Sequence, residues 1–373
     1  MQSTYSLPYF DPLQQTIDAL GRELAGLFQI DGVRTHRRGN SISFAGRLLY
    51  DAGFTYDELQ RRFNDHGYTP VLRREGGQDV VVALEGVLGK ARTGNPLVNV
   101  LLLVITIVTT LAAGAALYDV SLWAAVRSGS PVRLLQALLA GAPFAITLLG
   151  ILGVHELGHY VAARLHGVAA TLPYFIPMPL NGLGTMGAFI ALKSPMKDRR
   201  VLFDVGLAGP LAGLLVAIPL LIVGVLLSDV GPAGLVGRTL GSSLLVKGLV
   251  GLLRDVPANA ALIPHPIFIA AWFGLFITGL NLLPAGQLDG GHVAYALFGK
   301  RAYTLAGLTF AALLLLGLMG SRLWMIWAFF ILLSGLRHPA PLNDVSNLGG
   351  WRKILGWLSI LLFFLLIVPV PFS

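Results

Sequence analysis

Two histidines and a glutamate lie close together in an apolar stretch of the chain, I-L-G-V-H-E-L-G-H-Y. His155 and His159 are four positions apart, so a helix would place both imidazoles on one face, where they could share a tetrahedral metal ion. Glu156 follows His155 directly and would lie on the neighbouring face. The pattern H-E-x-x-H is typical of two zinc-binding imidazoles and a glutamate that takes a proton from metal-bound water.

The chemistry that this spacing favours is attack of water on a carbonyl group. Zinc lowers the pKa of its bound water from about 15.7 to near 7, and a nearby carboxylate can then accept the proton and deliver it to a leaving amine. The alternative is three packed or solvated helix residues. Ionisable groups at bilayer depth cost roughly 2.5 kcal/mol or more each, so three of them on one apolar segment favour a metal as the compensating partner.

A second polar cluster lies in the stretch F-I-T-G-L-N-L-L-P-A-G-Q-L-D-G-G-H, at the end of another apolar run. Asp289 offers a carboxylate, which commonly completes a catalytic zinc site beside two histidines, although it could equally be a turn residue or an N-cap. Asn281 could orient a scissile carbonyl or donate to its oxyanion, or could instead bond to broken helix backbone. We expect His292 to have a supporting or structural role, because catalytic zinc needs an open position for water.

The composition indicates a polytopic membrane protein. Of the 373 residues, 55% are hydrophobic and only 12% are charged. The net charge of +8 is carried by basic residues that cluster beside apolar runs, so they favour membrane orientation, and we expect no nucleic-acid partner. The chain has no cysteine, which excludes disulfides, thiolate zinc ligands and cysteine nucleophiles. The N-terminus has no basic start followed by an apolar core, so we expect no cleaved signal peptide.

The N-terminal quarter of the chain differs in composition from the rest. Residues 1–92 carry charges throughout and predict a small soluble α+β domain in the order helix, hairpin, helix, hairpin. Asp11-Pro12 is a typical helix start, and Arg38-Gly39-Asn40 is a turn signal for the first hairpin. Thr55 and Glu58 form a capping box, which predicts the start of the second helix.

The remaining residues, 93–373, predict a membrane-embedded domain with its core at about residues 143–300. Within it, the segment between Gly167 and Arg200 is too rich in proline and glycine for a helix and too apolar for a solvated loop. Such backbone must be buried in protein or line a cavity. Residues 187–192 resemble a strand edge, and we expect this edge to pair with an unwound substrate segment by strand addition.

Basic residues predict the orientation in the membrane. If the N-terminal domain is cytoplasmic, the basic connections at residues 193–200, 300–301, 337 and 352–353 all lie on the inner side. We therefore expect an integral, multi-pass membrane protein with its N-terminal domain and the active-site side facing the cytoplasm.

Three separated motifs resemble those of the site-2 protease family of intramembrane zinc metalloproteases. H-E-L-G-H at His155–His159 matches the family's zinc-binding helix, and A-G-P-L-A-G at Ala208–Gly213, whose small residues predict close helix packing, matches its following helix. N-L-L-P-A-G-Q-L-D-G at Asn281–Gly290 matches the N-P-D-G signature. The resemblance covers roughly Phe144–Lys300 and includes no PDZ or CBS module. The N-terminal domain is similar to that of the cyanobacterial and chloroplast branch.

The resemblance implies that His155, His159 and Asp289 bind Zn2+, that Glu156 is the catalytic acid and base, and that Asn281 helps to position the substrate. The implied fold is a polytopic α-helical membrane protein with a site-2 protease-like core and a small N-terminal soluble α/β domain. The implied activity is that of a zinc metalloendopeptidase in the lipid bilayer. It would hydrolyse peptide bonds within or beside a transmembrane helix of a membrane-protein substrate, as in regulated intramembrane proteolysis.

Two other classes of protein could bury such residues. A transporter with a buried metal site would more often show internal repeats with paired broken helices, and the sequence has no such repeats. A catalytically inactive membrane scaffold would have little reason to keep both histidines, the glutamate and a third ligand together. No pattern in the sequence predicts an oligomeric state.

Overall fold

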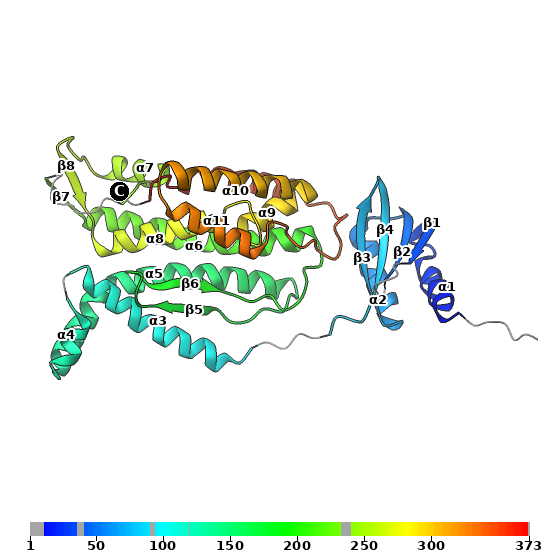
Figure 1. Cartoon of the computed structure of the whole chain (residues 1–373), viewed down its shortest axis with the longest axis horizontal. Helices are drawn as coiled ribbons and strands as arrows, with labels where there is room; N and C mark the ends of the chain where they lie inside the picture. Colours follow the sequence, from blue (N-terminus) through cyan, green and yellow to red (C-terminus); the bar gives the residue numbers. More distant parts are fainter. Residues whose placement is uncertain (1–10, 36–40, 90–93, 119, 233–239, 372–373) are drawn as a thin grey trace, which may run out of the picture. The chain divides into compact units, whose positions relative to one another are not determined.

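The chain forms two compact units in a computed structural model that describes residues 11–35, 41–89, 94–118, 120–232 and 240–371 (Figure 1). The first unit combines residues 1–90 with the segments 195–200 and 340–348, and the second unit contains the remaining residues. Each unit has its own hydrophobic core.

The first unit is a four-stranded antiparallel sheet with two helices. Its elements are α1 (Pro12–Leu24), β1 (Phe28–Thr35), β2 (Ser41–Leu48), α2 (Ala52–Asp65), β3 (Tyr68–Glu75) and β4 (Gln78–Glu85). The strand order is β1-β2-β4-β3, so β1 and β3 are the outer strands. The turn predicted at Arg38-Gly39-Asn40 lies outside the described residues.

The N-caps of the two helices show where local sequence patterns succeed and fail. Asp11 caps α1 as predicted, because its carboxylate accepts a hydrogen bond of 3.0 Å from the backbone N–H of Leu13. The capping box predicted at Thr55 is wrong. Asp51 caps α2 instead, accepting from Gly53 N–H at 2.8 Å, so the helix begins one turn earlier and Thr55 is buried inside it. An earlier acidic cap takes precedence because it satisfies the first free N–H groups of the helix.

A distant segment of the chain completes the outer edge of this sheet. The backbone N–H of Leu72 in β3 donates to Leu342 O at 2.8 Å, and Asp344 N–H donates to Leu72 O at 3.0 Å, which makes a parallel bridge between Leu72 and Asn343. The fully buried Asn343 also donates its side-chain amide to Ala52 O at 2.8 Å, just inside α2. Residues 340–348 therefore cover the edge of β3, where an open strand would otherwise expose unpaired backbone groups.

The second unit is mostly helical. Its elements are α3 (Pro96–Ala116), α4 (Leu122–Arg127), α5 (Pro131–Leu165), β5 (Tyr174–Met178), β6 (Gly184–Phe189), α6 (Arg199–Leu227, of which the first two residues belong to the first unit), β7 (Asp229–Pro232), α7 (Leu244–Leu253), β8 (Ala260–Ile263), α8 (Pro266–Asn281), α9 (Asp289–Phe298), a 3-10 turn (Gly299–Arg301), α10 (Ala302–Met319), α11 (Leu323–Ser334) and α12 (Gly350–Leu366). Strands β5 and β6 form one antiparallel hairpin, and β7 and β8 pair in a second small sheet.

Four helical stretches are long and apolar enough to cross a membrane, by length and composition. They are Pro96–Ala116, Pro131–Leu165, Arg199–Leu227 and Asp289–Met319, the last of which joins α9 to α10. Three shorter apolar helices accompany them, at Leu244–Leu253, Pro266–Asn281 and Leu323–Ser334. The H-E-x-x-H motif lies near the end of α5, a helix that begins at Pro131 because Ser130 caps it there.

The core of the second unit packs α6, α8, α10 and α11 around two large aromatic side chains, Trp272 and Trp324. Each indole is buried and donates its N–H to a backbone carbonyl at 2.7 Å, to Gly241 O and Pro369 O respectively. Because an unpaired indole N–H would be costly here, the paired rings supply apolar area without that penalty. This core holds α8 and the start of α9 in place, from which part of the polar site projects.

Candidate metal centre

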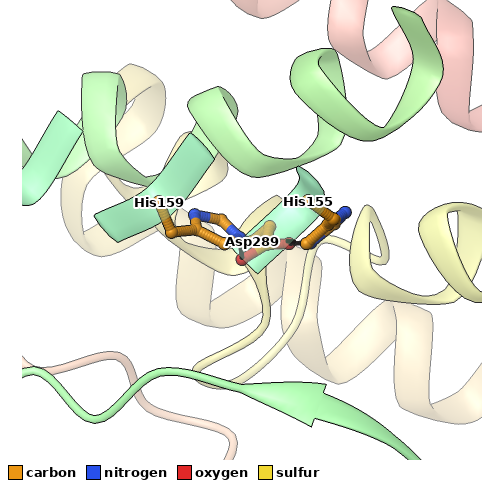
Figure 2. A group of neighbouring side chains, drawn as sticks. All are labelled: His155, His159 and Asp289. Atoms are coloured by element: carbon orange, nitrogen blue, oxygen red, sulfur yellow. Dashed lines mark hydrogen bonds and ion pairs between the residues drawn. The ribbon is translucent and has the colours of Figure 1, made fainter. Parts of the chain in front are cut away.

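Three side chains from two elements converge in the second unit (Figure 2). His155 and His159 project from α5, and Asp289 is the first residue of α9. Nε2 of His155 lies 3.2 Å from Asp289 Oδ2, Nε2 of His159 lies 3.2 Å from Asp289 Oδ1, and the two Nε2 atoms are 3.1 Å apart. The structure therefore brings together the three residues that the sequence predicts as metal ligands, 134 positions apart at the widest.

The donor set and its spacing fit a zinc ion. A tetrahedral zinc with bonds of about 2.0 to 2.1 Å holds its ligand atoms roughly 3.3 Å apart, close to the separations found here. Both histidines are buried, and Asp289 is nearly so, which leaves little water to compete for them. Two imidazoles and one carboxylate are also the set that leaves a fourth position open for water.

A backbone contact fixes the orientation of His159. Its Nδ1 lies 2.7 Å from the carbonyl oxygen of Val205 in α6, and since a carbonyl can only accept, Nδ1 carries the hydrogen. The lone pair of the neutral ring is then on Nε2, which points at Asp289. Such a hydrogen bond to the far nitrogen is the usual way in which a metal-binding histidine is oriented.

Glycines in α6 make room for both imidazoles. A methyl group on Gly209 would lie 2.1 Å from Nε2 of His159, and one on Gly213 would lie 3.2 Å from Nδ1 of His155. On the other helix, a methyl group on Gly158 would lie 2.6 Å from the carbonyl oxygen of Ala208. The close helix packing predicted from A-G-P-L-A-G is thus confirmed, and the small residues of α6 are also what admits the rings.

The D-G-G sequence fixes the entry into α9. The N-cap of α9 is Leu288, so Asp289 is not the N-cap and its carboxylate is directed to the histidines. A methyl group on Gly290 would lie 2.0 Å from Leu282 O, and one on Gly291 would lie 2.4 Å from Gly286 O. Only glycine fits so close to this backbone, which explains why the carboxylate is followed by two glycines.

Glu156 and Asn281 lie on the wall of the same cavity. The cavity has a volume of about 190 Å3 and is lined by the three ligand residues, Glu156, Asn281, His292 and residues 188–190 of the β5–β6 hairpin, among others. Glu156 is buried and lines the cavity together with Ile190. Asn281 ends α8, and its Nδ2 lies 3.5 Å from Nε2 of His155. Both predicted catalytic side chains therefore face the space beside the ligands.

A second histidine pair includes one residue of this wall, His292. His292, one turn after Asp289 on α9, shares a hydrogen bond through Nδ1 with Nε2 of His338. His338 lies in the loop after α11, yet its side chain is buried and stacks on the ring of Tyr295. Sequence reasoning missed this partnership, since the two histidines are 46 positions apart and neither stands in a motif with the other.

Asp204 has a structural role in the second unit. Arg352 donates two hydrogen bonds to its carboxylate, from Nε at 2.8 Å and Nη2 at 2.7 Å, and Nε2 of His166 lies 3.0 Å from the same group. Asp204 is thus paired with basic residues and is not part of the ligand cluster found in the described residues.

The comparisons with known proteins agree with this geometry. Residues 143–319 match the model of Peptidase family M50, which confirms the resemblance to site-2 proteases over this part of the chain. The chain is 37% identical over 246 residues to the probable zinc metalloprotease EGY1, chloroplastic, of Oryza sativa subsp. japonica. The aligned region covers 64% of this chain and 42% of that protein. With the four long apolar helices, the match identifies an integral membrane protein.

Two further relatives give the same picture. The EGY1 protein of Arabidopsis thaliana is 38% identical over 62% of this chain and 43% of its own length, and the probable zinc metalloprotease EGY2, chloroplastic, of the same plant is 33% identical over 64% and 44%. The chain thus spans less than half the length of these relatives. No solved structure matches the chain significantly.

Proposed function

We propose that the protein is an intramembrane zinc endopeptidase that hydrolyses peptide bonds within or beside a transmembrane helix of membrane-protein substrates. The observation that carries the proposal is the convergence of His155, His159 and Asp289 on one buried point, with Glu156 on the wall of the same cavity. The similarity to proteins named as probable zinc metalloproteases supports the same reaction class.

The polar residues of the cavity have distinct roles in this reaction. The two histidines and Asp289 would hold Zn2+, which supplies a Lewis acid and lowers the pKa of bound water toward neutrality. Glu156 takes the proton of the attacking water and delivers it to the leaving amine. Asn281 donates its amide N–H to the carbonyl oxygen, on which negative charge develops.

The β5–β6 hairpin supports a mode of substrate binding. Within the described residues, strand β6 pairs with β5 along one edge, and the residues at its end, 188–190, line the cavity. An unwound substrate segment adding to the other edge would bring its peptide bonds toward Glu156, which lines the same cavity. A transmembrane helix must unwind in this way before a peptide bond can be cut.

Proline substitution tests the strand addition. We expect Ile190→Pro and Ala188→Pro to abolish cleavage while zinc binding survives, because proline removes an edge N–H. The control is Leu180→Ala in the exposed turn of the same hairpin. Unchanged cleavage by the proline variants would exclude pairing through β6.

The orientation in the membrane is part of the same proposal. The basic connections favour a soluble N-terminal domain, residues 1–92, and an active-site side that face the cytoplasm, with residues 93–373 in the membrane. Because the chain has no cysteine, a single cysteine at the exposed Gln78 gives a clean test. It should react with a membrane-impermeant maleimide only when the cytoplasmic side is open.

The decisive experiment compares wild type with Glu156→Gln, using a reconstituted model transmembrane substrate and measuring bound zinc in both proteins. We expect Glu156→Gln to keep its zinc and to lose cleavage by a factor of about 100 or more, because general-base catalysis contributes about that much. Equal cleavage by the two proteins would refute the role of Glu156. Absence of zinc from both would refute the metal site itself.

A further inference from the structure

A buried asparagine stands in the otherwise apolar helix α3. Asn99 is 6% exposed, and its side-chain amide donates to two successive carbonyls outside the helix, Leu172 O at 2.8 Å and Pro173 O at 3.0 Å. These carbonyls immediately precede β5. A polar side chain in a helix that crosses a membrane is costly unless it is paired. Asn99 donates both N–H groups of its amide to the residues just before the β5–β6 hairpin.

A threonine of the same helix contacts the other end of the hairpin. The hydroxyl of Thr109 lies 2.6 Å from the carbonyl oxygen of Gly184, where β6 begins. Carbonyls of its own helix, Ile105 O and Thr106 O, lie farther away at 3.1 Å, so the single hydroxyl hydrogen is directed to Gly184. The two backbones touch here, since a methyl group on Gly184 would lie 2.3 Å from Thr109 O.

These contacts hold the hairpin at both ends along one helix. Asn99 and Thr109 are ten positions apart, which corresponds to roughly 15 Å along α3. Asn99 bonds to the open end of the hairpin, and Thr109 bonds to the end beside its turn. Helix α3 packs against both strands, whereas the far end of β6 leads to Ile190, which lines the cavity together with Glu156. The hairpin thus lies between α3 and the cavity.

We propose that Asn99 and Thr109 are positioning residues for the proteolytic reaction. This inference rests on the function proposed above. The two residues fix the β5–β6 hairpin on α3, and thereby set the register in which the free edge of β6 presents a substrate strand to Glu156. Neither residue touches the ligands or lines the cavity. Their effect passes through the backbone of the hairpin alone.

Two other threonines of α3 provide matched controls. The hydroxyl of Thr106 bonds only within its own helix, to Leu102 O at 2.7 Å. The hydroxyl of Thr110 is buried without a hydrogen-bond partner in the part of the chain that the structure describes. Both side chains are buried in the same helix as Thr109, so Thr106→Val and Thr110→Val make the same chemical change without removing a hydrogen bond to the hairpin.

The first measurement follows the hairpin itself. A spin label on Met186→Cys, an exposed position of β6 in a chain with no other cysteine, reports the mobility of the strand. We expect Asn99→Leu and Thr109→Val, alone and combined, to increase this mobility, and Thr106→Val to leave it unchanged. Thr109→Ser keeps the hydroxyl and should restore the wild-type signal.

The second measurement follows the reaction without the spin label. We expect kcat/KM for a model transmembrane substrate to fall about tenfold in Asn99→Leu and in Thr109→Val, and about a hundredfold in the double variant. Small misplacements of bound groups carry costs of this size. Cleavage should also spread to neighbouring peptide bonds, which a loss of helix packing alone would not cause. Bound zinc should remain at the wild-type level.

The outcomes separate this inference from the proposed function. If label mobility and cleavage site in Asn99→Leu and Thr109→Val equal those of Thr106→Val, the positioning role is overturned. If the wild type does not cut at all, the proposed function fails, while the mobility of the label still shows whether the two side chains hold the hairpin. Loosening of the hairpin with an unchanged cleavage site also overturns the role in register.

Discussion

Replacing Gly209 by alanine should disrupt the metal centre through steric displacement alone. The added methyl group would lie 2.1 Å from Nε2 of His159 and 2.3 Å from its Cδ2, whereas ordinary contact begins at 3.4 Å. The imidazole must therefore retreat by roughly 1.3 Å, or α6 must move away from α5 by a similar amount. Neither movement is easy, because His159 also bonds to Val205 of the same helix.

The magnitude follows from the tolerance of zinc ligation. Ligand distances are held within about 0.2 Å, so a displacement above 1 Å removes His159 from the ligand set. Loss of orienting contacts alone lowers metal affinity about 10 to 100-fold, and loss of a ligand should exceed that. We expect zinc affinity to fall at least a hundredfold, which corresponds to about 2.7 kcal/mol. Helix propensity works in the opposite direction, since alanine favours a helix over glycine by about 1 kcal/mol.

The assay is titration of zinc into purified, metal-depleted protein against a chromophoric chelator, with thermal unfolding as a check on the fold. Gly150→Ala in α5 is the matched control, because a methyl group there meets nothing within 4 Å. Gly213→Ala should give a smaller loss than Gly209→Ala, since its methyl group lies 3.2 Å from His155. If Gly209→Ala binds zinc as tightly as Gly150→Ala does, the steric reasoning is refuted.

Further tests address three residues outside the catalytic cavity. Burial lowers the pKa of His338 from 6.5 to about 4, so its contribution to stability is present above pH 6.5 and is lost as the pH falls toward 4. In His338→Gln, the unfolding temperature should depend less on pH over that interval. Asn343→Leu removes the side-chain bond to Ala52 O and the acceptor of the Val345 and Ser346 N–H groups, so it should cost about 1 to 3 kcal/mol, seen as faster hydrogen exchange in β3. Arg352→Met should lower the unfolding temperature by freeing Asp204, and Arg352→Lys should restore less than half of the loss, because lysine lacks the two-pronged geometry.

The parts of the site that follow from the sequence are those in which spacing has a geometric meaning. His155 and His159 are four residues apart, and the helical repeat alone places them on one face. Asp289 is different, because no local pattern places it beside the two histidines. It was predicted as a ligand because a catalytic zinc site needs a third protein ligand besides two histidines. The glycines of α6 were expected to allow close packing, but not to be the positions against which the imidazoles rest.

The features that the sequence did not reveal depend on contacts between distant segments. Asn343 bonds to Ala52 across 291 positions, and no periodicity or motif connects them. Arg352 is a plain basic residue in the sequence until Asp204 is found beside it. Thr55 was misjudged for a local reason, because a capping box and an acidic cap compete within one turn and the sequence does not show which begins the helix.

The covering of β3 by residues 340–348 also has a consequence for the order of events during synthesis. At about 5 to 20 residues per second, the segment that pairs with Leu72 leaves the ribosome roughly 10 to 50 s after β4 does. In that interval the edge of β3 is open, and the helices from α3 to α11 are made and inserted. The sheet is therefore completed only after the helices from α3 to α11 have been made, so a chain stalled before residue 340 would display an unpaired strand for quality-control factors to recognise.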